Sequence, residues 1–185
     1  MTDAAVLAAL ANPARARILD LLYVDGPATA SVLAEGTSTA IGSVSHHVKM
    51  LAEAGLVVEA PELARDRRER WWRPATAGFS WSSGDFADDP VAESAEAAAA
   101  HQALQRQFER ARDWLATPVD NPTSRRWSDT AYATQTWLTL SPEELQQVAV
   151  EIQSVFARWH ERAISDDGVE RRTVLAFSRA FPCRP

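Results

Sequence analysis

Residues 39–53 combine polar side chains with a helical spacing of aliphatic ones. At about 100° per residue, the aliphatic side chains fall on one side of a helix, and small, neutral or basic side chains fall on the other. The first set is Ile41, Val44, Val48 and Leu51, and the second is Thr39, Gly42, Ser43, His46 and Lys49. Such a helix can pack on a domain with one face and offer hydrogen-bonding groups to base edges and phosphates with the other.

Acidic residues are absent from this part of the chain. No Asp or Glu occurs in residues 36–51, although the whole chain has 25 of them. A carboxylate on this surface would repel phosphate groups, so the gap favours a surface that faces nucleic acid. Gly42 and Ser43 are small enough to let the helix approach base edges closely.

Basic residues gather shortly afterwards, between two strand candidates at 56–58 and 69–73. Two such strands form a β-ribbon whose arginines can reach the phosphate backbone or the adjacent minor groove. These arginines are Arg65, Arg67, Arg68 and Arg70. Asp66 and Glu69 are interspersed among them, and we expect these acids to reduce the net positive charge and to orient the arginines by ion pairing.

Two helices are predicted at the start of the chain to support these groups. The first covers residues 3–10. Asn12 then provides an N-cap, and Pro13 occupies the first position of a second helix that runs to about Tyr23.

A short helix is predicted at residues 30–35, with Val32 and Leu33 as core candidates. After a three-residue turn, Thr39 is the expected N-cap of the polar helix. Gly55 is expected to end that helix as a left-handed cap.

Three separated blocks resemble the ArsR-type winged helix-turn-helix repressors. They are LANPARARIL at 10–19, SVSHHVKML at 43–51 and AGLV at 54–57, in the order and at the spacing of that family. The stretch at 60–73 is similar to a branch with an extended C-terminal region. The resemblance covers about residues 5–75 and implies a symmetric homodimer that binds a palindromic operator in double-stranded DNA. Members often repress transcription until a ligand or a metal releases them.

The sequence departs from the metal sensors of that family. They use a Cys pair on the helix before the recognition helix, or Asp, His and Glu on the last helix. Residues 30–35 contain no such pair, and His101 and Glu109 lack metal-ligand spacing. The adjacent His46 and His47 point about 100° apart on a helix, so they do not converge on one ion. We predict no metal and no cofactor.

The predicted DNA-binding residues come from the turn, the polar helix and the β-ribbon. We expect Thr39, Ser43 and His46 to contact base edges, and Lys49 and the arginines to contact phosphates. The full set is Thr37, Ser38, Thr39, Gly42, Ser43, Ser45, His46, His47, Lys49, Arg65, Arg67, Arg68 and Arg70.

The C-terminal half begins after a predicted linker at 76–89. A long helix at about 91–116 carries an apolar stripe suited to dimerisation or domain packing: Val91, Ala95, Ala98, Leu104, Phe108, Ala111 and Leu115. A strand at 132–140, a helix opened by the capping box at Ser141, and a strand at 172–181 follow. The predicted fold is α+β, mainly α. It has a winged helix-turn-helix domain at 1–75 and a C-terminal domain at 90–185 that combines the long helix with a strand-helix-strand unit.

Composition sets further bounds. The 185 residues carry a net charge of −6, of which −1 lies in residues 1–75, so the overall charge does not advertise nucleic-acid binding. The start of the chain lacks the basic pattern of a signal peptide, and no apolar run is long enough to span a membrane, so a cytoplasmic location is expected. No catalytic motif is recognisable, and we predict that the protein is not an enzyme.

Alternatives remain open at this point. A winged helix can also serve as a protein-interaction module. Five tryptophans outside the DNA-binding part are expected to be mostly core, but they could instead line an apolar pocket for a small-molecule effector. They are Trp81, Trp114, Trp127, Trp137 and Trp159.

Overall fold

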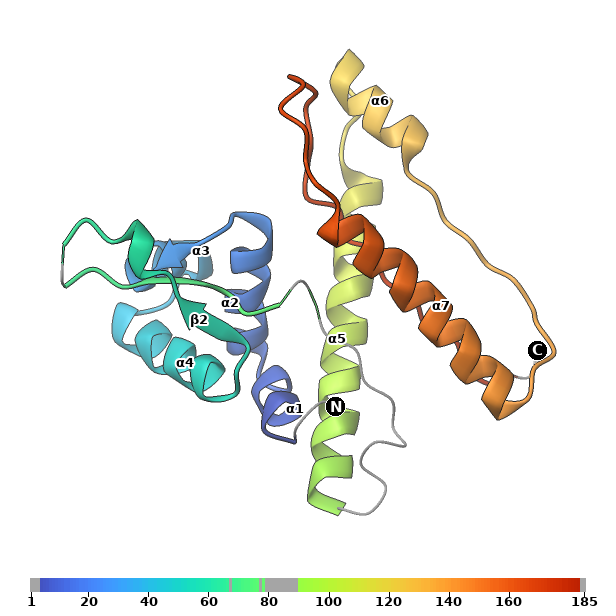
Figure 1. The fold of residues 1–185 in the computed structure, drawn as a ribbon, viewed down its shortest axis with the longest axis horizontal. Helices are drawn as coiled ribbons and strands as arrows, with labels where there is room; N and C mark the ends of the chain where they lie inside the picture. The colour runs from blue at the N-terminus through green and yellow to red at the C-terminus, as the bar shows by residue number, and fades with distance from the viewer. Residues whose placement is uncertain (1–3, 67, 77, 79–89, 184–185) are drawn as a thin grey trace. The chain divides into compact units, whose positions relative to one another are not determined.

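The computed structural model describes residues 4–66, 68–76, 78 and 90–183 (Figure 1). Arg67, Trp81 and nearly all of the predicted linker lie outside the described residues. The chain divides into two compact units, residues 1–109 and residues 110–185. The predicted boundaries at 75 and 90 separate a DNA-binding domain from a dimerisation domain, and this functional division stays a prediction.

Four helices open the first unit: α1 (Ala4–Leu10), α2 (Pro13–Val24), α3 (Ala30–Thr37) and α4 (Ile41–Glu53). The predicted start of α2 is confirmed. The side chain of Asn12 accepts a hydrogen bond of 3.1 Å from the amide of Arg15, and proline occupies the first helical turn. These local signals fix where α2 begins because they satisfy or remove N–H groups that the helix itself leaves unpaired.

The turn between α3 and α4 is tighter than the sequence indicates. Ser38 adopts a left-handed conformation with φ of 52°, and α4 begins only at Ile41, with Ala40 as its N-cap. The predicted capping role of Thr39 is therefore wrong: its hydroxyl donates to the carbonyl of Thr37 at 3.2 Å instead. At the other end of α4, Gly55 has φ of +71°, which confirms the predicted left-handed turn.

The predicted β-ribbon is confirmed as part of a small antiparallel sheet. Strands β2 (Val57–Glu59) and β3 (Trp71–Pro74) pair with Val58 opposite Arg73. A third strand, β1 (Ala28–Thr29), pairs with the other edge of β3 and gives the order β1-β3-β2. Two residues are too few to show an alternating pattern, so β1 has no sequence signal.

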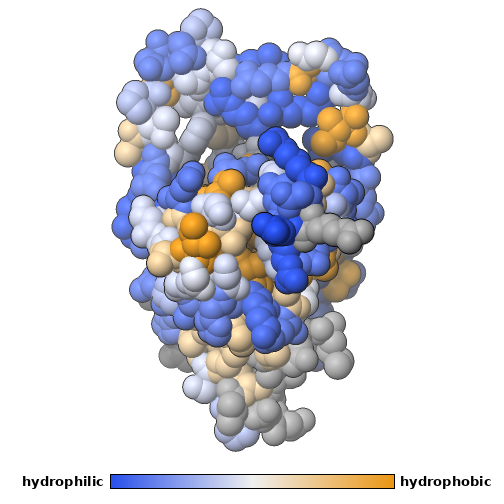
Figure 2. All heavy atoms as spheres, turned by 90° about the vertical axis from the view of Figure 1, so that its left-hand side faces the viewer, coloured by the Kyte–Doolittle hydropathy of each residue, from blue (hydrophilic) through white to orange (hydrophobic). Residues whose placement is uncertain are grey.

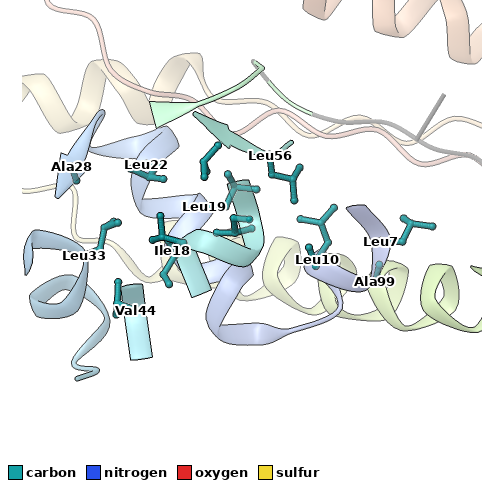
Figure 3. Packing of buried hydrophobic residues seen from close by; sticks show 14 of the residues in the cluster. Leu7, Leu10, Ile18, Leu19, Leu22, Ala28, Leu33, Val44, Leu56 and Ala99 are labelled. Atoms are coloured by element: carbon teal, nitrogen blue, oxygen red, sulfur yellow. The ribbon is translucent and has the colours of Figure 1, made fainter. Parts of the chain in front are cut away.

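Buried aliphatic side chains from α1 to α4 join with the sheet in one core (Figure 3). Val44, Val48 and Leu51 are at most 1% exposed, so α4 packs with three of its four predicted apolar residues. The largest fully buried side chains are Leu7, Leu10, Ile18, Leu19, Leu22, Leu33, Leu51, Val44, Val48 and Val57.

Two predicted core residues are instead exposed. Ile41 is 53% exposed because it is the first residue of α4, where the helix leaves the surface turn. Val32 is 52% exposed because α3 is short and turns its Leu33 and Ala34 side toward the core. Helical periodicity gives the direction of a side chain, but it does not say how far the neighbouring elements extend over it.

Helix α5 (Pro90–Ala116) has nearly the predicted bounds. Ala92 and Ala99 join the core of the first unit, as Figure 3 shows for Ala99. Arg106 lies 3.7 Å from Asp20 of α2, in an ion pair that is largely shielded from solvent. Small alanine side chains let this part of α5 lie close to the helices of the first unit.

The predicted apolar stripe of this helix is only partly used in this packing: Ala95 packs against the core, whereas other members of the stripe are exposed. Ala98 is exposed, Phe108 is 52% exposed and Leu115 is 82% exposed. Their use in dimerisation stays a prediction.

The second unit contains α6 (Pro122–Thr130) and α7 (Pro142–Glu161). The predicted capping box of α7 is confirmed. The Ser141 hydroxyl accepts from the amide of Glu144 at 3.2 Å, and the Glu144 carboxylate accepts from the amide of Ser141 at 2.7 Å. Helix α6 was not predicted, although Asn121 gives it a capping box of the same type.

The predicted strand-helix-strand arrangement is wrong at both strands. Residues 132–140 and 172–181 form no strand, and every residue of both stretches is exposed. Alternating side chains favour a strand only where another strand is available to accept its backbone hydrogen bonds, and the two stretches are not paired with each other. The expected burial of the tryptophans also fails for three of them, since Trp114, Trp137 and Trp159 are 44%, 67% and 58% exposed.

No helix in the described part of the chain combines the length and apolar character needed to cross a bilayer.

Candidate nucleic-acid interface

The outer face of α4 carries the polar side chains that the sequence places there. Gly42, Ser43, Ser45, His46 and Lys49 are all exposed. A side chain added at Gly42 would meet no atom within 4 Å, so the helix surface is open at that position. The buried residues on the opposite side anchor the helix in the core, and the exposed face therefore has a fixed direction.

The turn before α4 adds three predicted residues to the same end of the helix. Thr37 and Thr39 are half-buried, and Ser38 is exposed. The hydroxyl of Thr37 donates to the carbonyl of Leu33 at 2.7 Å, which helps to end α3. Ser38 is thus the most accessible hydroxyl of the turn.

A shallow hollow of about 210 Å³ lies beside this turn. Its lining combines residues from α2, the turn and α4: Pro13, Ala14, Arg17, Ile18, Thr37, Thr39, Val44 and His47. Arg17 was missed by sequence reasoning. Its guanidinium donates to the carbonyl of Gly36 at 3.5 Å, which places a positive charge next to the predicted DNA-binding turn. Arg17 lies in a different helix and only the tertiary structure brings it here, so no spacing in the sequence could have indicated it.

His47 is held in a partly desolvated position. Its Nδ1 is buried and has no hydrogen-bond partner among the described residues. Burial lowers the pKa of His47 below its ordinary value, and the nearby charges of Arg15 and His46 act in the same direction. His47 is therefore a poorer candidate for contacting phosphate as a cation than its exposed neighbour His46.

This environment predicts a pH dependence of folding. The unfolded chain takes up a proton at His47 near pH 6.5, and the folded chain does so only at lower pH. Well above pH 6.5, His47 should therefore have no effect on the free energy of unfolding. The free energy of unfolding should fall as the pH drops from about 7.5 to 5.5. Urea titrations across this range should show a smaller fall in the His47→Gln variant. His160→Gln, on the exposed surface of α7, is the control and should keep the full dependence. An identical pH profile for His47→Gln and the parent protein would contradict this account.

Lys49 forms an exposed ion pair with Glu53, one helical turn away, at 3.7 Å. Such surface pairs contribute about 0–1 kcal/mol, so the ammonium group can exchange its carboxylate for a phosphate at little cost.

The acidic residues of the β-ribbon act differently from the prediction. Asp66 accepts hydrogen bonds from the amides of Arg68 and Glu69, at 2.7 and 3.1 Å, and Glu69 accepts from the amide of Arg65 at 2.8 Å. These two carboxylates therefore stabilise the backbone of the loop. Among the described residues, no carboxylate pairs with the guanidinium of Arg65 or Arg68, and both side chains are at least partly exposed.

Arg70 is the predicted arginine that does form an ion pair, with Glu59 on the neighbouring strand at 3.3 Å. It lies on the ribbon rather than at its tip, so Arg65 and Arg68 are the more available cations.

In the view of Figure 2, which faces the side of the molecule at the left of Figure 1, the surface is mostly hydrophilic, and hydrophobic residues occur among the hydrophilic ones.

Metal ligands do not gather in the described residues: no three His, Cys, Asp or Glu side chains lie where they could hold one ion.

The comparison with protein families matches part of the same segment. Residues 10–60 match a family model described as a helix-turn-helix domain. Among solved structures, the chain is similar to a homodimeric winged helix-turn-helix DNA-binding domain from Mycobacterium bovis, described as a possible ArsR-family transcriptional regulator. The identity is 24%, the match covers 64% of this chain and 85% of that one, and the TM-score of 0.36 is a weak overall likeness. No curated protein matches the sequence.

The helix-turn-helix match and the small sheet β1-β3-β2 together show that the first unit contains a winged helix-turn-helix domain. The matched residues 10–60 contain all three of the sequence blocks at 10–19, 43–51 and 54–57.

Proposed function

We propose that the protein recognises a specific sequence in double-stranded DNA as a homodimer and represses transcription there. The observation that carries the proposal is the outer face of α4, which has no acid before Glu53 and is held in one direction by the buried Val44, Val48 and Leu51. A helix fixed in this way can enter the major groove without losing its contacts to the domain.

We propose two kinds of contact with DNA. Thr39, Ser43 and His46 read base edges, and Gly42 permits the close approach. The positioning contacts to phosphate come from Lys49, from the exposed arginines of the β-ribbon, and from Arg17 beside the turn. The proposed set also includes the remaining predicted residues, which are close to these in the sequence: Thr37, Ser38, Ser45, His47, Arg67 and Arg70.

A symmetric dimer would place two copies of α4 in successive major grooves, about 34 Å apart. We propose that residues 1–75 read DNA and that the C-terminal domain at 90–185 joins the two copies. We propose that the signal that releases the protein from DNA is not a metal ion. The exposure of Trp114, Trp137 and Trp159 gives an aromatic effector pocket no support.

A mobility-shift experiment on the DNA upstream of the protein's own gene tests the proposal. The folded dimer should retard this fragment at low salt and should prefer it to unrelated DNA of equal length. A dimer that retards neither fragment would contradict the proposal and would favour the alternative, a winged helix used to bind another protein. Equal retardation of both fragments would contradict only the part of the proposal that concerns recognition of a specific sequence.

The β-ribbon makes a separate prediction about salt. Arg65→Ala and Arg68→Ala together should weaken binding to all DNA sequences, because these residues contact phosphates rather than bases. The dependence of log K on log salt concentration should flatten by about 0.9 for each phosphate that the variant no longer neutralises. Fluorescence anisotropy over a series of salt concentrations measures this slope. Arg125→Ala in α6 is the matched control and should leave it unchanged. An unaltered slope in the double variant would show that Arg65 and Arg68 of the ribbon do not contact phosphates of the DNA.

A further inference from the structure

Helix α7 has an apolar face that is only partly covered within the chain. Leu145 and Val148 on this face are half-buried. Ile152, Val155 and Phe156 are 36–39% exposed, although all three lie on the same side of the helix. The full apolar face is Leu145, Val148, Ile152, Val155, Phe156 and Trp159.

Charges follow one flank of this face in a definite order. At about 100° per residue, Glu144, Glu151, Arg158 and Arg162 fall within roughly 40° of one another, next to the apolar side chains. The acidic pair lies in the first half of α7. Arg158 lies in its last turn, and Arg162 follows the helix as its C-cap, with the guanidinium over the ring of Trp159. Glu151 accepts a hydrogen bond of 3.4 Å from Gln147 of its own helix, a contact that leaves its second oxygen available.

This order of charges distinguishes the two ways in which a second copy could pack on the face. In a parallel pair, this flank of each helix would lie beside the opposite flank of the other copy, so the four charges would not meet one another. In an antiparallel pair related by a two-fold axis, the same flank of each helix meets with its direction reversed. The midpoint of Glu144 and Arg162 is residue 153, and the midpoint of Glu151 and Arg158 lies between residues 154 and 155. Both midpoints are within one turn of Ile152, so one register satisfies both ion pairs and the apolar contact.

We propose that α7 binds α7 of a second copy of this chain in an antiparallel pair centred near residue 153. The proposal names a contact face that the proposed DNA-binding homodimer leaves unspecified. It does not rest on DNA binding, because the contact can be measured in the absence of DNA.

Disulfide trapping in the full chain tests the position of the contact. The background variant is Cys183→Ser, because Cys183 is free and exposed. In the proposed pair, the two copies of Ile152 lie about 3 Å apart along the helix axis. Ile152→Cys should therefore form linked dimers under mild oxidation at least tenfold faster than Val150→Cys, which places a thiol on the opposite face of the same helix. Equal rates for the two variants would overturn the proposal.

A third cysteine variant tests the direction. In the antiparallel pair, the two copies of Leu145 lie about 24 Å apart along the axis, too far for a disulfide. Leu145→Cys should therefore link no faster than Val150→Cys. Linking as fast as in Ile152→Cys would show a parallel pair and overturn the proposed register.

Charge reversal provides a readout that does not depend on the geometry of a disulfide. In the Ile152→Cys background, Glu151→Arg should slow linking about three- to tenfold at low salt, because it places a positive charge opposite Arg158 of the other copy. Arg158→Glu should have a similar effect, and the two changes together should restore the original rate. A double variant as slow as the single variants would contradict the proposed ion pair.

Discussion

Replacing Ser43 with Glu should weaken binding to the operator at least about 100-fold while the domain stays folded. Ser43 is exposed on the outer face of α4, and a carboxylate there would face phosphates and base-edge acceptors. Like-charge contact at an interface costs several kcal/mol, and about 2.8 kcal/mol corresponds to 100-fold in affinity.

The same substitution should not destabilise the helix. Ser43 is the third residue of α4, near its N-terminus, where a negative charge interacts favourably with the helix dipole. A loss of DNA binding therefore cannot be ascribed to unfolding. Fluorescence anisotropy with operator DNA and a thermal melt of each variant separate the two effects.

Ser94→Glu is the matched control, because it adds the same charge to an exposed position in the first turns of α5. It should bind DNA like the parent protein. Should Ser43→Glu bind operator with unchanged affinity, the outer face of α4 is not the DNA-binding surface.

Replacing Leu51 with Ala should reduce the free energy of unfolding of the first unit by about 3–4 kcal/mol. Leu51 is 0% exposed and belongs to the core cluster, so the change leaves a cavity where α4 packs on the domain. Small domains are stable by about 5–15 kcal/mol, so the loss is a large part of the total. Urea denaturation followed by far-ultraviolet circular dichroism measures it.

Ile41→Ala is the comparison that separates the structure from the sequence pattern. Helical periodicity puts Ile41 on the apolar side together with Leu51, whereas the structure leaves it 53% exposed. The Ile41 variant should lose less than about 1 kcal/mol. Equal losses in the two variants would show that Ile41 is buried and that α4 begins differently.

The sequence was a good guide wherever local chemistry decides the outcome. Asn12 with Pro13, Gly55 and Ser141 mark the ends of helices correctly, because a cap acts on the few residues beside it. The two faces of α4 were predictable for a similar reason, since a buried side fixes which residues remain outside. The ribbon followed from two short strands that are close in the chain and hence pair easily.

Predictions failed where a distant neighbour decides. Residues 132–140 and 172–181 alternate like strands but have no strand beside them. The first part of α5 packs through Ala92, Ala95 and Ala99, of which the predicted stripe includes only Ala95, because close approach to the core requires small side chains. Arg17 joins the DNA-binding surface only because α2 folds beside the turn that precedes α4.

By itself, the sequence determined the winged helix-turn-helix and the outward face of α4, because caps, periodicity and the absence of acids act over short stretches of chain. The tertiary structure alone decided that Asp66 and Glu69 hold the ribbon loop, that His47 is partly buried, and that Arg17 lies beside the turn. Those properties depend on desolvation and on contacts between segments far apart in the chain, and neither quantity is encoded in the spacing of residues.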